Sequence, residues 1–211
     1  MPSTLQPGPK PAPTPANFAA RTPAHAVARL ITEFCAPAVL VGVLLLLQPL
    51  LTPGVSWLHA AAAAVFTVGL PFAGILWLKR RGSVTDHHIG VRSQRAPVLA
   101  GAALSLGAGA LLLVVLGAPA ALFGEMGGVF IGLMLCLAVN LVWKLSVHSA
   151  VAAYVGLALL APVPALGPAL ALLLASATGW SRIELGAHTP TQVLAGHAAG
   201  CAAFAAALML P

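Results

Sequence analysis

Long apolar runs separated by short breaks make up most of the chain from residue 35 onward. Seven runs can be distinguished, at residues 35–51, 55–78, 97–116, 120–143, 146–160, 165–179 and 190–210. Crossing a hydrocarbon core of about 30 Å takes roughly 20 mostly apolar residues, and Pro and Gly stand in several of the breaks. The pattern predicts an all-α, polytopic membrane helix bundle of about six to seven transmembrane helices. The fifth and sixth runs are short, so one shallow hairpin is the alternative to two full crossings there.

The amino-acid composition agrees with a membrane protein. Hydrophobic residues make up 60% of the 211 residues and charged residues 7%, with a mean hydropathy of +0.99, far above what a water-soluble domain carries. Residues 1–30 differ, because they are rich in Pro, Ala and Thr and show no apolar period. We therefore expect a disordered cytoplasmic tail at 1–30, without a cleaved signal peptide, and a membrane-embedded domain at 31–211.

The basic residues give the chain a net charge of +6, which in a soluble protein would suggest a nucleic-acid partner. In a membrane protein their positions matter more, and with seven spans all of them fall on one side. They are Lys10, Arg21, Arg29, Lys79, Arg80, Arg81, Arg92, Arg95, Lys144 and Arg182. The positive-inside rule then places this side in the cytoplasm and the C-terminus outside, in a multi-pass protein of the cell membrane. We expect membrane lipids as partners, and no nucleic acid.

Three short segments carry most of the remaining polar and ionisable side chains. They cover residues 85–97, 143–149 and 181–192, and each lies at the end of an even-numbered apolar run. Since every helical hairpin returns the chain to the same face, the three segments are expected to meet at the cytoplasmic interface.

These segments contain groups that suit a bound phosphate and two bases. The candidates are Arg92, Arg95, Lys144, Ser146, His148, Arg182 and His188. Guanidinium forks match phosphate oxygens, and each histidine can accept or donate a proton. The sequence shows no Cys/His cluster with metal-ligand spacing, since the pair His87 and His88 lacks a third ligand. The residues therefore predict no metal site and no cofactor.

Two of the segments resemble motifs of the type 2 phosphatidic acid phosphatase superfamily, membrane lipid phosphatases that share a core fold with vanadium haloperoxidases. Ser181 and Arg182, followed after five residues by His188, are similar to the third motif of that family. Ser146 and His148, with Val147 between them, are similar to the second motif, Pro-Ser-Gly-His.

The first polar segment resembles a variant of that family's first motif. Asp86, Arg92 and Arg95, with Pro97 closing the segment, follow its Asp…Arg…Arg form with one residue inserted before the proline. The likeness extends over most of the chain from about residue 36 onward, including the placement of the motifs between spans.

The resemblance implies a role for each matched residue. His188 would be the nucleophile that forms a phosphohistidine, and His148 would protonate the leaving alkoxide and later activate water. Arg182 would stabilise the transferred phosphoryl group. A further set would bind the phosphate oxygens, namely Arg92, Arg95, Lys144, Ser146 and Ser181.

Two positions depart from the family pattern. Gln192 stands where the family has the Asp that orients the nucleophilic histidine, and the leading Lys of the first motif has no counterpart unless Lys144 replaces it in space. The carbonyl of Gln192 can accept from an imidazole N–H and fix the tautomer, but it cannot stabilise an imidazolium as a carboxylate does. Asp86 and Glu184 are the carboxylates that could supply the missing charge.

The expected function is hydrolysis of a lipid phosphate ester or diphosphate, with polyprenyl phosphates as the first substrate class and glycerolipid phosphates as the second. Two alternatives stay open at this point. One is a phosphotransferase in which an alcohol replaces water at the phosphohistidine. The other is a catalytically silent lipid-phosphate-binding protein, because Gln192 lacks the charge of the usual Asp. The sequence leaves the oligomeric state open.

Overall fold

The computed structural model of the protein describes residues 22–82 and 95–210, except for the side chains of Arg95 and Ala96. Every regular element in these ranges is a helix, which confirms the all-α prediction. The elements are α2 (Pro23–Phe34), α3 (Pro37–Leu51), α4 (Trp57–Ala64), η1 (Val65–Gly69), α5 (Leu70–Arg80), α6 (Arg95–Val115), α7 (Ala120–Val142), α8 (Val147–Val155), η3 (Gly156–Leu160), α9 (Gly167–Glu184) and α10 (Pro190–Ala207).

Each predicted apolar run contains one continuous helix. α4, the π-helical turn η1 and α5 follow one another without a break, and α8 continues directly into the π-helical turn η3. The loops between helices fall at the predicted Pro and Gly positions. Gly54 and Gly117 adopt φ angles of 82° and 67° there, a left-handed conformation that glycine takes without steric cost.

Three helices are long and apolar enough to cross a membrane by length and composition, namely Trp57–Arg80, Pro97–Val115 and Ala120–Val142. α2 and α3, bent by 43° at their junction, add a fourth if the pair is one broken span. The segment Val147–Leu160 is apolar but shorter. The described chain thus has several helices that could span a membrane, and the total of six to seven crossings stays a prediction.

The outward faces of these helices are apolar. On α6, Leu104, Leu111 and Val115 are largely exposed, and on α9 Leu172 and Leu173 are exposed as well. A contiguous apolar surface of this kind is costly in water and marks contact with lipid or with a partner. The outward faces therefore agree with a membrane environment for the bundle.

Helix α2 corrects the predicted boundary between tail and membrane domain. It begins at Pro23, so residues 23–30 are helical, whereas residues 1–21 lie outside the described chain. The Thr22 side chain caps the helix by accepting from the His25 N–H at 3.2 Å. Ala28 and Thr32, one turn apart, are buried where α2 packs against α9. Sequence reasoning missed this helix because its apolar positions are too few to form a long run.

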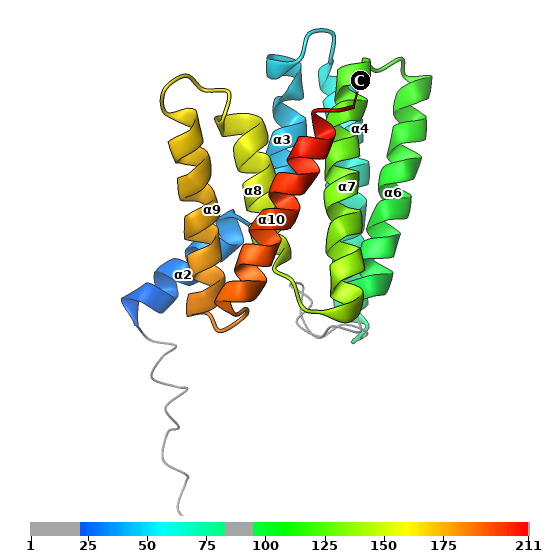
Figure 1. Ribbon diagram of the computed structural model, residues 1–211. Helices are drawn as coiled ribbons and strands as arrows, with labels where there is room; N and C mark the ends of the chain where they lie inside the picture. The colour runs from blue at the N-terminus through cyan, green and yellow to red at the C-terminus, as the bar shows by residue number, and fades with distance from the viewer. Residues whose placement is uncertain (1–21, 83–94, 211) are drawn as a thin grey trace, which may run out of the picture.

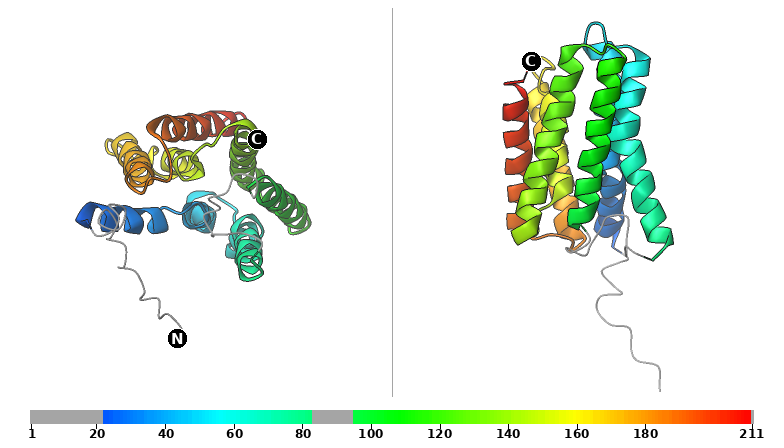
Figure 2. Two further views of the ribbon diagram at one scale, coloured as in Figure 1. Left: turned by 90° about the horizontal axis from the view of Figure 1, so that it is seen from below. Right: turned by 90° about the vertical axis from the view of Figure 1, so that its right-hand side faces the viewer.

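The helices from α3 to α10 stand side by side and run alternately in opposite directions (Figure 1). Seen along the bundle, α8 lies between α3, α9 and α10, while α5, α6 and α7 follow one another on the other side (Figure 2). The exposure of the side chains agrees with this arrangement, because seven of the nine residues of α8 are buried. The central helix therefore carries His148 at its first turn.

Close packing of α8 against α10 depends on two glycines. A Cβ atom at Gly196 would collide with the carbonyl oxygen of Ser146, and one at Gly200 with that of Ala150. The four-residue spacing of Gly196 and Gly200 predicts such an approach of two helices, and the structure confirms it. The polar first turn of α8 is thereby held directly against α10.

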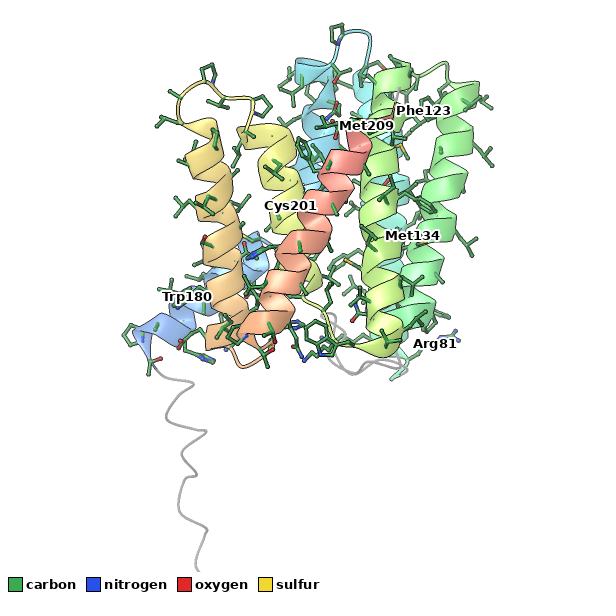
Figure 3. The ribbon with its side chains drawn as sticks, in the orientation of Figure 1. Arg81, Phe123, Met134, Trp180, Cys201 and Met209 are labelled. Atoms are coloured by element: carbon green, nitrogen blue, oxygen red, sulfur yellow. The ribbon has the colours of Figure 1, made fainter. Side chains whose placement is uncertain are left out.

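One end of the bundle collects the polar connections. The α7–α8 and α9–α10 loops, the last turn of α5 and helix α2 all lie there, and the α3–α4, α6–α7 and α8–α9 loops lie at the opposite end (Figure 1). Arg81 and Trp180 lie toward the polar end, while Phe123 and Met209 lie toward the other (Figure 3). Two of the three predicted polar segments are thus at the same end, as expected. Most of the first segment, 85–97, is outside the described residues.

Candidate functional site

A cavity of about 500 Å³ opens at the polar end of the bundle. His148, Arg182 and His188 all line it, although they come from α8, from the last turn of α9 and from the α9–α10 loop. His148 is 6% and Arg182 7% exposed, and His188 is half-buried. The three residues that the sequence singled out as the central groups therefore share one partly enclosed space.

Hydrogen bonds at Gln192 settle which ring nitrogen of His188 carries the proton. The Thr189 backbone N–H donates to Gln192 Oε1 at 3.3 Å, which identifies this atom as the amide oxygen. His188 Nδ1 lies 3.1 Å from the same oxygen, so Nδ1 bears the hydrogen in the neutral ring. Nε2 consequently carries the lone pair, which is the arrangement a nucleophilic histidine needs. The expected contact of Gln192 with the imidazole is confirmed.

The loop that carries His188 is held from two sides. The carbonyl of Arg182 accepts the N–H groups of Ala187 at 3.0 Å and His188 at 3.1 Å, while Gly186 takes a φ angle of 62° to let the chain turn. Lys144 Nζ donates to the carbonyl of Ala187 at 2.6 Å. Lys144 does not line the cavity. Its described contact, with the Ala187 carbonyl, stabilises the loop.

Ser146 joins the second polar segment to the third. Its N–H donates to the carbonyl of Gln192 at 3.2 Å. Its Oγ accepts from the Ser149 N–H at 3.3 Å and from the Ser149 hydroxyl at 2.9 Å, which caps α8. Ser146 is fully buried and does not line the cavity. In this structure it fixes the start of the helix that presents His148.

Ser181 also lies behind the cavity, in a chain of hydroxyl groups. Its Oγ donates to the carbonyl of Thr178 at 2.7 Å and lies 3.0 Å from Thr32 Oγ1. Arg182 Nη1 donates to Thr32 Oγ1 at 3.3 Å. Arg182 thus reaches the cavity. Its neighbour Ser181 contacts Thr32, the residue that accepts a hydrogen bond from Arg182.

The remaining predicted site residues lie elsewhere. Asp86 and Arg92 are outside the described residues, and Arg95 begins α6 with a side chain that is outside them too. Glu184 is the last residue of α9, is exposed, and does not line the cavity. Its expected support of His188 is therefore not part of the described contacts.

Two residues of this site, Thr32 and Glu33, are not predicted by the sequence patterns. Both lie on α2, and Glu33 lines the cavity while Thr32 contacts Arg182. A signal was present in the spacing of Ala28 and Thr32, four residues apart, which marks a packed helix face. This face is hard to recognise because the Pro-, Ala- and Thr-rich composition of residues 1–30 predicts a tail that includes Ala28.

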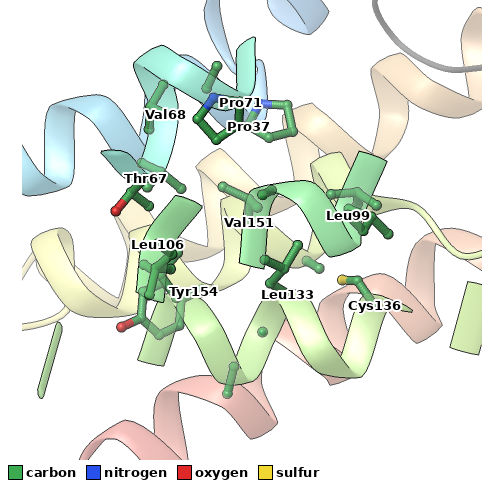
Figure 4. A pocket seen from close by; sticks show the side chains of 18 of the residues that line it. Pro37, Thr67, Val68, Pro71, Leu99, Leu106, Leu133, Cys136, Val151 and Tyr154 are labelled. Carbon is green, nitrogen blue, oxygen red and sulfur yellow. The ribbon is translucent and has the colours of Figure 1, made fainter. Parts of the chain in front are cut away.

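An apolar cavity of about 180 Å³ adjoins the polar one. The two share lining residues on α3, α5 and α6, among them Pro37, Phe72 and Leu99. Deeper in the bundle the smaller cavity is lined by Leu106, Cys136 and Tyr154 (Figure 4). The site therefore offers a polar end, where an anion can meet Arg182 and two histidines, continuous with apolar walls.

Among the described residues, no group of three or more His, Cys, Asp or Glu side chains is placed to hold a metal ion. Comparison with known proteins adds nothing to the geometry, because a scan against protein-family models, a search of curated proteins and a search of solved structures found no match to the chain.

Proposed function

We propose that the protein is a membrane phosphatase that hydrolyses a lipid phosphate ester or diphosphate through a phosphohistidine intermediate. The observation that carries this proposal is the shared cavity of His148, Arg182 and His188, together with the Gln192 contact at Nδ1, which in the neutral ring leaves the lone pair on His188 Nε2. A nucleophile, a second base and a fixed positive charge are the three elements that metal-independent phosphoryl transfer requires. Membership in the type 2 phosphatidic acid phosphatase superfamily is part of the same proposal.

The proposed reaction has two steps. His188 Nε2 forms a bond to phosphorus while the bond from phosphorus to the lipid oxygen breaks, and His148 gives its proton to that leaving oxygen. Water then attacks the phosphohistidine, His148 takes a proton from the water, and the bond between phosphorus and Nε2 breaks to release phosphate. In both steps Arg182 stabilises the negative charge on the phosphoryl oxygens. Arg92 and Arg95 would add further positive charge.

The substrate in this proposal has a long apolar chain. The continuity between the polar cavity and the apolar one supports a lipid over a soluble phosphate ester. Polyprenyl phosphates and diphosphates remain the first candidates, and glycerolipid phosphates such as phosphatidate the second. Apolar walls bind either chain, so a substrate panel has to rank them.

The proposed orientation places the cavity at the cytoplasmic interface of the cell membrane, with six to seven crossings and the C-terminus outside. Lys79, Arg80 and Arg81 at the end of α5 support this, since they lie at the same end of the bundle as the cavity. Arg81 also stacks over the ring of Trp77 at 4.1 Å, a pairing typical of the interface.

Labelling of single cysteines tests the orientation. In a chain whose own cysteines have been replaced, Val163→Cys at the far end should react with a membrane-impermeant thiol reagent on intact cells. Glu184→Cys at the cavity end should react only after permeabilisation. The reverse pattern would overturn the cytoplasmic placement and leave the chemistry untouched.

Phosphate release tests the activity. Purified protein in detergent, with a chelator present, should release phosphate from at least one member of a panel of polyprenyl and glycerolipid phosphates. His188→Ala should abolish the release, and Gly101→Ala, at a position with open space around it, should not. Release that depends on an added metal, or that survives in His188→Ala, would contradict the proposed mechanism.

One specific observation favours a second candidate, a catalytically silent lipid-phosphate-binding protein. Gln192 is neutral, so the positive charge that the His188 ring gains when Nε2 bonds to phosphorus is not stabilised by a carboxylate at this position. Binding of the lipids without release of phosphate, by a protein that gains activity on Gln192→Asp, would establish this alternative. Transfer of phosphate to an added alcohol in place of water would establish a phosphotransferase.

A further inference from the structure

We propose that Thr32 is a positioning residue that sets the orientation of the Arg182 guanidinium in the phosphate site. This inference rests on the proposed function, since it assigns a task to Arg182 in binding a phosphoryl group. Thr32 belongs to α2, 150 positions before Arg182, and helix α2 crosses the cavity end of α9 (Figure 1). No motif in the sequence connects the two residues.

The hydrogen-bond directions around Thr32 follow from the partners. A carbonyl oxygen can only accept, so Ser181 gives its hydroxyl hydrogen to Thr178. The contact of 3.0 Å between Ser181 Oγ and Thr32 Oγ1 then requires Thr32 to donate. A guanidinium can only donate, so Thr32 Oγ1 accepts from Arg182 Nη1 at 3.3 Å. The chain runs in one direction, from Arg182 through Thr32 and Ser181 to the backbone of α9.

Burial strengthens this series of hydrogen bonds. Thr32 is 2% and Ser181 0% exposed, so water does not compete for either hydroxyl, and each makes the contacts that a buried polar group needs. The series of hydrogen bonds ends at the Thr178 carbonyl in the backbone of α9, which fixes the place of Thr32 Oγ1. A guanidinium is a planar fork, and its value for a phosphoryl group depends on the direction in which it points. Thr32 thus provides a fixed acceptor on the side of Arg182 that faces α2.

Three substitutions separate orientation from packing. Thr32→Val keeps the shape and removes the hydroxyl, while Thr32→Ser keeps the hydroxyl and removes a methyl group. Thr178→Val is the matched control, because Thr178 is also fully buried and its Oγ1 has no hydrogen-bond partner within the described part of the chain. Thr178 takes part in the network through its carbonyl alone, which valine retains.

The expected result is a loss of activity that follows the hydroxyl. Thr32→Val should lower kcat/KM for the preferred lipid phosphate about tenfold, Thr32→Ser should stay within about threefold of the parent, and Thr178→Val should match the parent. Equal losses in Thr32→Val and Thr178→Val, or a loss in Thr32→Ser as large as in Thr32→Val, would overturn the proposal, since either would indicate a packing effect.

A double-substitution cycle tests the route through Arg182. If Thr32 acts by orienting the guanidinium, Thr32→Val should cost no more than about twofold in a chain that already carries Arg182→Lys. Independent losses that multiply in the double variant would show that Thr32 stabilises the fold and does not position Arg182, and would overturn the proposal.

Binding of inorganic phosphate, measured by calorimetry, separates this proposal from the proposed function. The parent protein should bind phosphate, Thr32→Val should bind it about tenfold more weakly, and Thr178→Val should bind it as the parent does. This readout needs no turnover. A parent that binds phosphate but hydrolyses no lipid would refute the phosphatase, and the phosphate affinity of Thr32→Val would still decide the role of Thr32. A parent that neither binds phosphate nor hydrolyses lipid would refute both the phosphatase and the role of Thr32.

Discussion

The two sides of the bundle are built differently. On one side α8 and α10 are packed backbone to backbone, with Gly196 and Gly200 against the carbonyl groups of Ser146 and Ala150. On the other side α5 has no buried residue among those described, and a cavity of about 780 Å³ lies between α5 and α6. A Cβ added at Gly101 on α6 would meet nothing within 4 Å.

The difference matches the two tasks that the proposed function requires. Phosphoryl transfer needs its groups held in one geometry, and the residues that serve it lie on the tightly packed side. An apolar chain needs only apolar walls of sufficient extent, and α5 and α6 contribute Phe72 and Leu99 to the lining of both cavities of the site. If this assignment is right, substitutions on the α8–α10 side should affect chemistry and stability, while similar substitutions on the α5–α6 side should be tolerated.

Among residues that do not react themselves, the largest effect is expected at Gln192. Gln192→Leu removes the oxygen that accepts from His188 Nδ1 and from the Thr189 N–H, so the ring loses its fixed tautomer. We expect kcat/KM for lipid phosphate hydrolysis to fall at least about 100-fold. Gln192→Asp restores an acceptor oxygen and adds a charge that stabilises the imidazolium, so its kcat should equal or exceed that of the parent. Activity that Gln192→Leu leaves intact would remove His188 from the nucleophile role.

A matched glycine pair tests the packing contrast itself. Gly200→Ala places a Cβ against the Ala150 carbonyl oxygen, so α10 has to move away from α8. We expect a loss of about 1–3 kcal/mol in the free energy of unfolding, measured by thermal or denaturant unfolding in detergent. Gly101→Ala on α6 should unfold at the same temperature or denaturant concentration as the parent, or at a slightly higher one. Equal effects of the two substitutions would contradict the difference in packing.

A smaller effect is expected at Lys144. Lys144→Met removes the donor to the Ala187 carbonyl, next to His188, and the loop becomes less well held. Because Lys144 is only half-buried, we expect kcat to fall about three- to tenfold, with little change in KM. Lys79→Met, at an exposed position on α5, serves as the control. A rise in KM without a change in kcat would assign Lys144 to substrate binding.

The smallest effect concerns the carboxylate in the cavity. Glu33→Gln removes a negative charge from the lining of a site that receives an anion, and Glu33 is exposed, so screening by water keeps the effect small. Phosphate should bind about two- to threefold more tightly, as measured by calorimetry. Glu184→Gln, outside the cavity lining, should leave the affinity unchanged. Weaker binding in Glu33→Gln would show that Glu33 holds a cationic group in place.

The helical architecture was largely predictable from the sequence. Apolar runs have to become helices in a membrane because lipid offers no hydrogen-bond partner to the backbone, and Pro and Gly punctuate them. The convergence of His148, Arg182 and His188 followed from the same argument, since hairpins return the chain to one end. Helix α2 was not predictable in this way, because it packs through the small faces of Ala28 and Thr32 and carries no long apolar run.

The tasks of the polar residues were harder to predict than their location. Lys144, Ser146 and Ser181 are predicted to contact phosphate. In the structure the described side-chain hydrogen bonds join Lys144 to Ala187, Ser146 to Ser149, and Ser181 to Thr178 and Thr32. The physical reason is that helix ends and loops have unpaired backbone groups of their own, and nearby polar side chains satisfy these first. A motif identifies which groups gather in one place, but the local backbone determines which of them remain available to a ligand.

The amide oxygen of Gln192 has a consequence for how the sequence can change over time. The same atom completes the capping box of α10 and orients the ring of His188, so one substitution affects a helix end and the His188 imidazole together. Neutral drift at this position is confined to residues that keep an acceptor oxygen within reach of both partners. Glu has the same side-chain length as Gln and keeps an acceptor oxygen, and a single nucleotide change converts a Gln codon into a Glu codon. The difference between a neutral and a charged orienting residue is thus a short evolutionary distance, and the chain can cross it without first losing its fold.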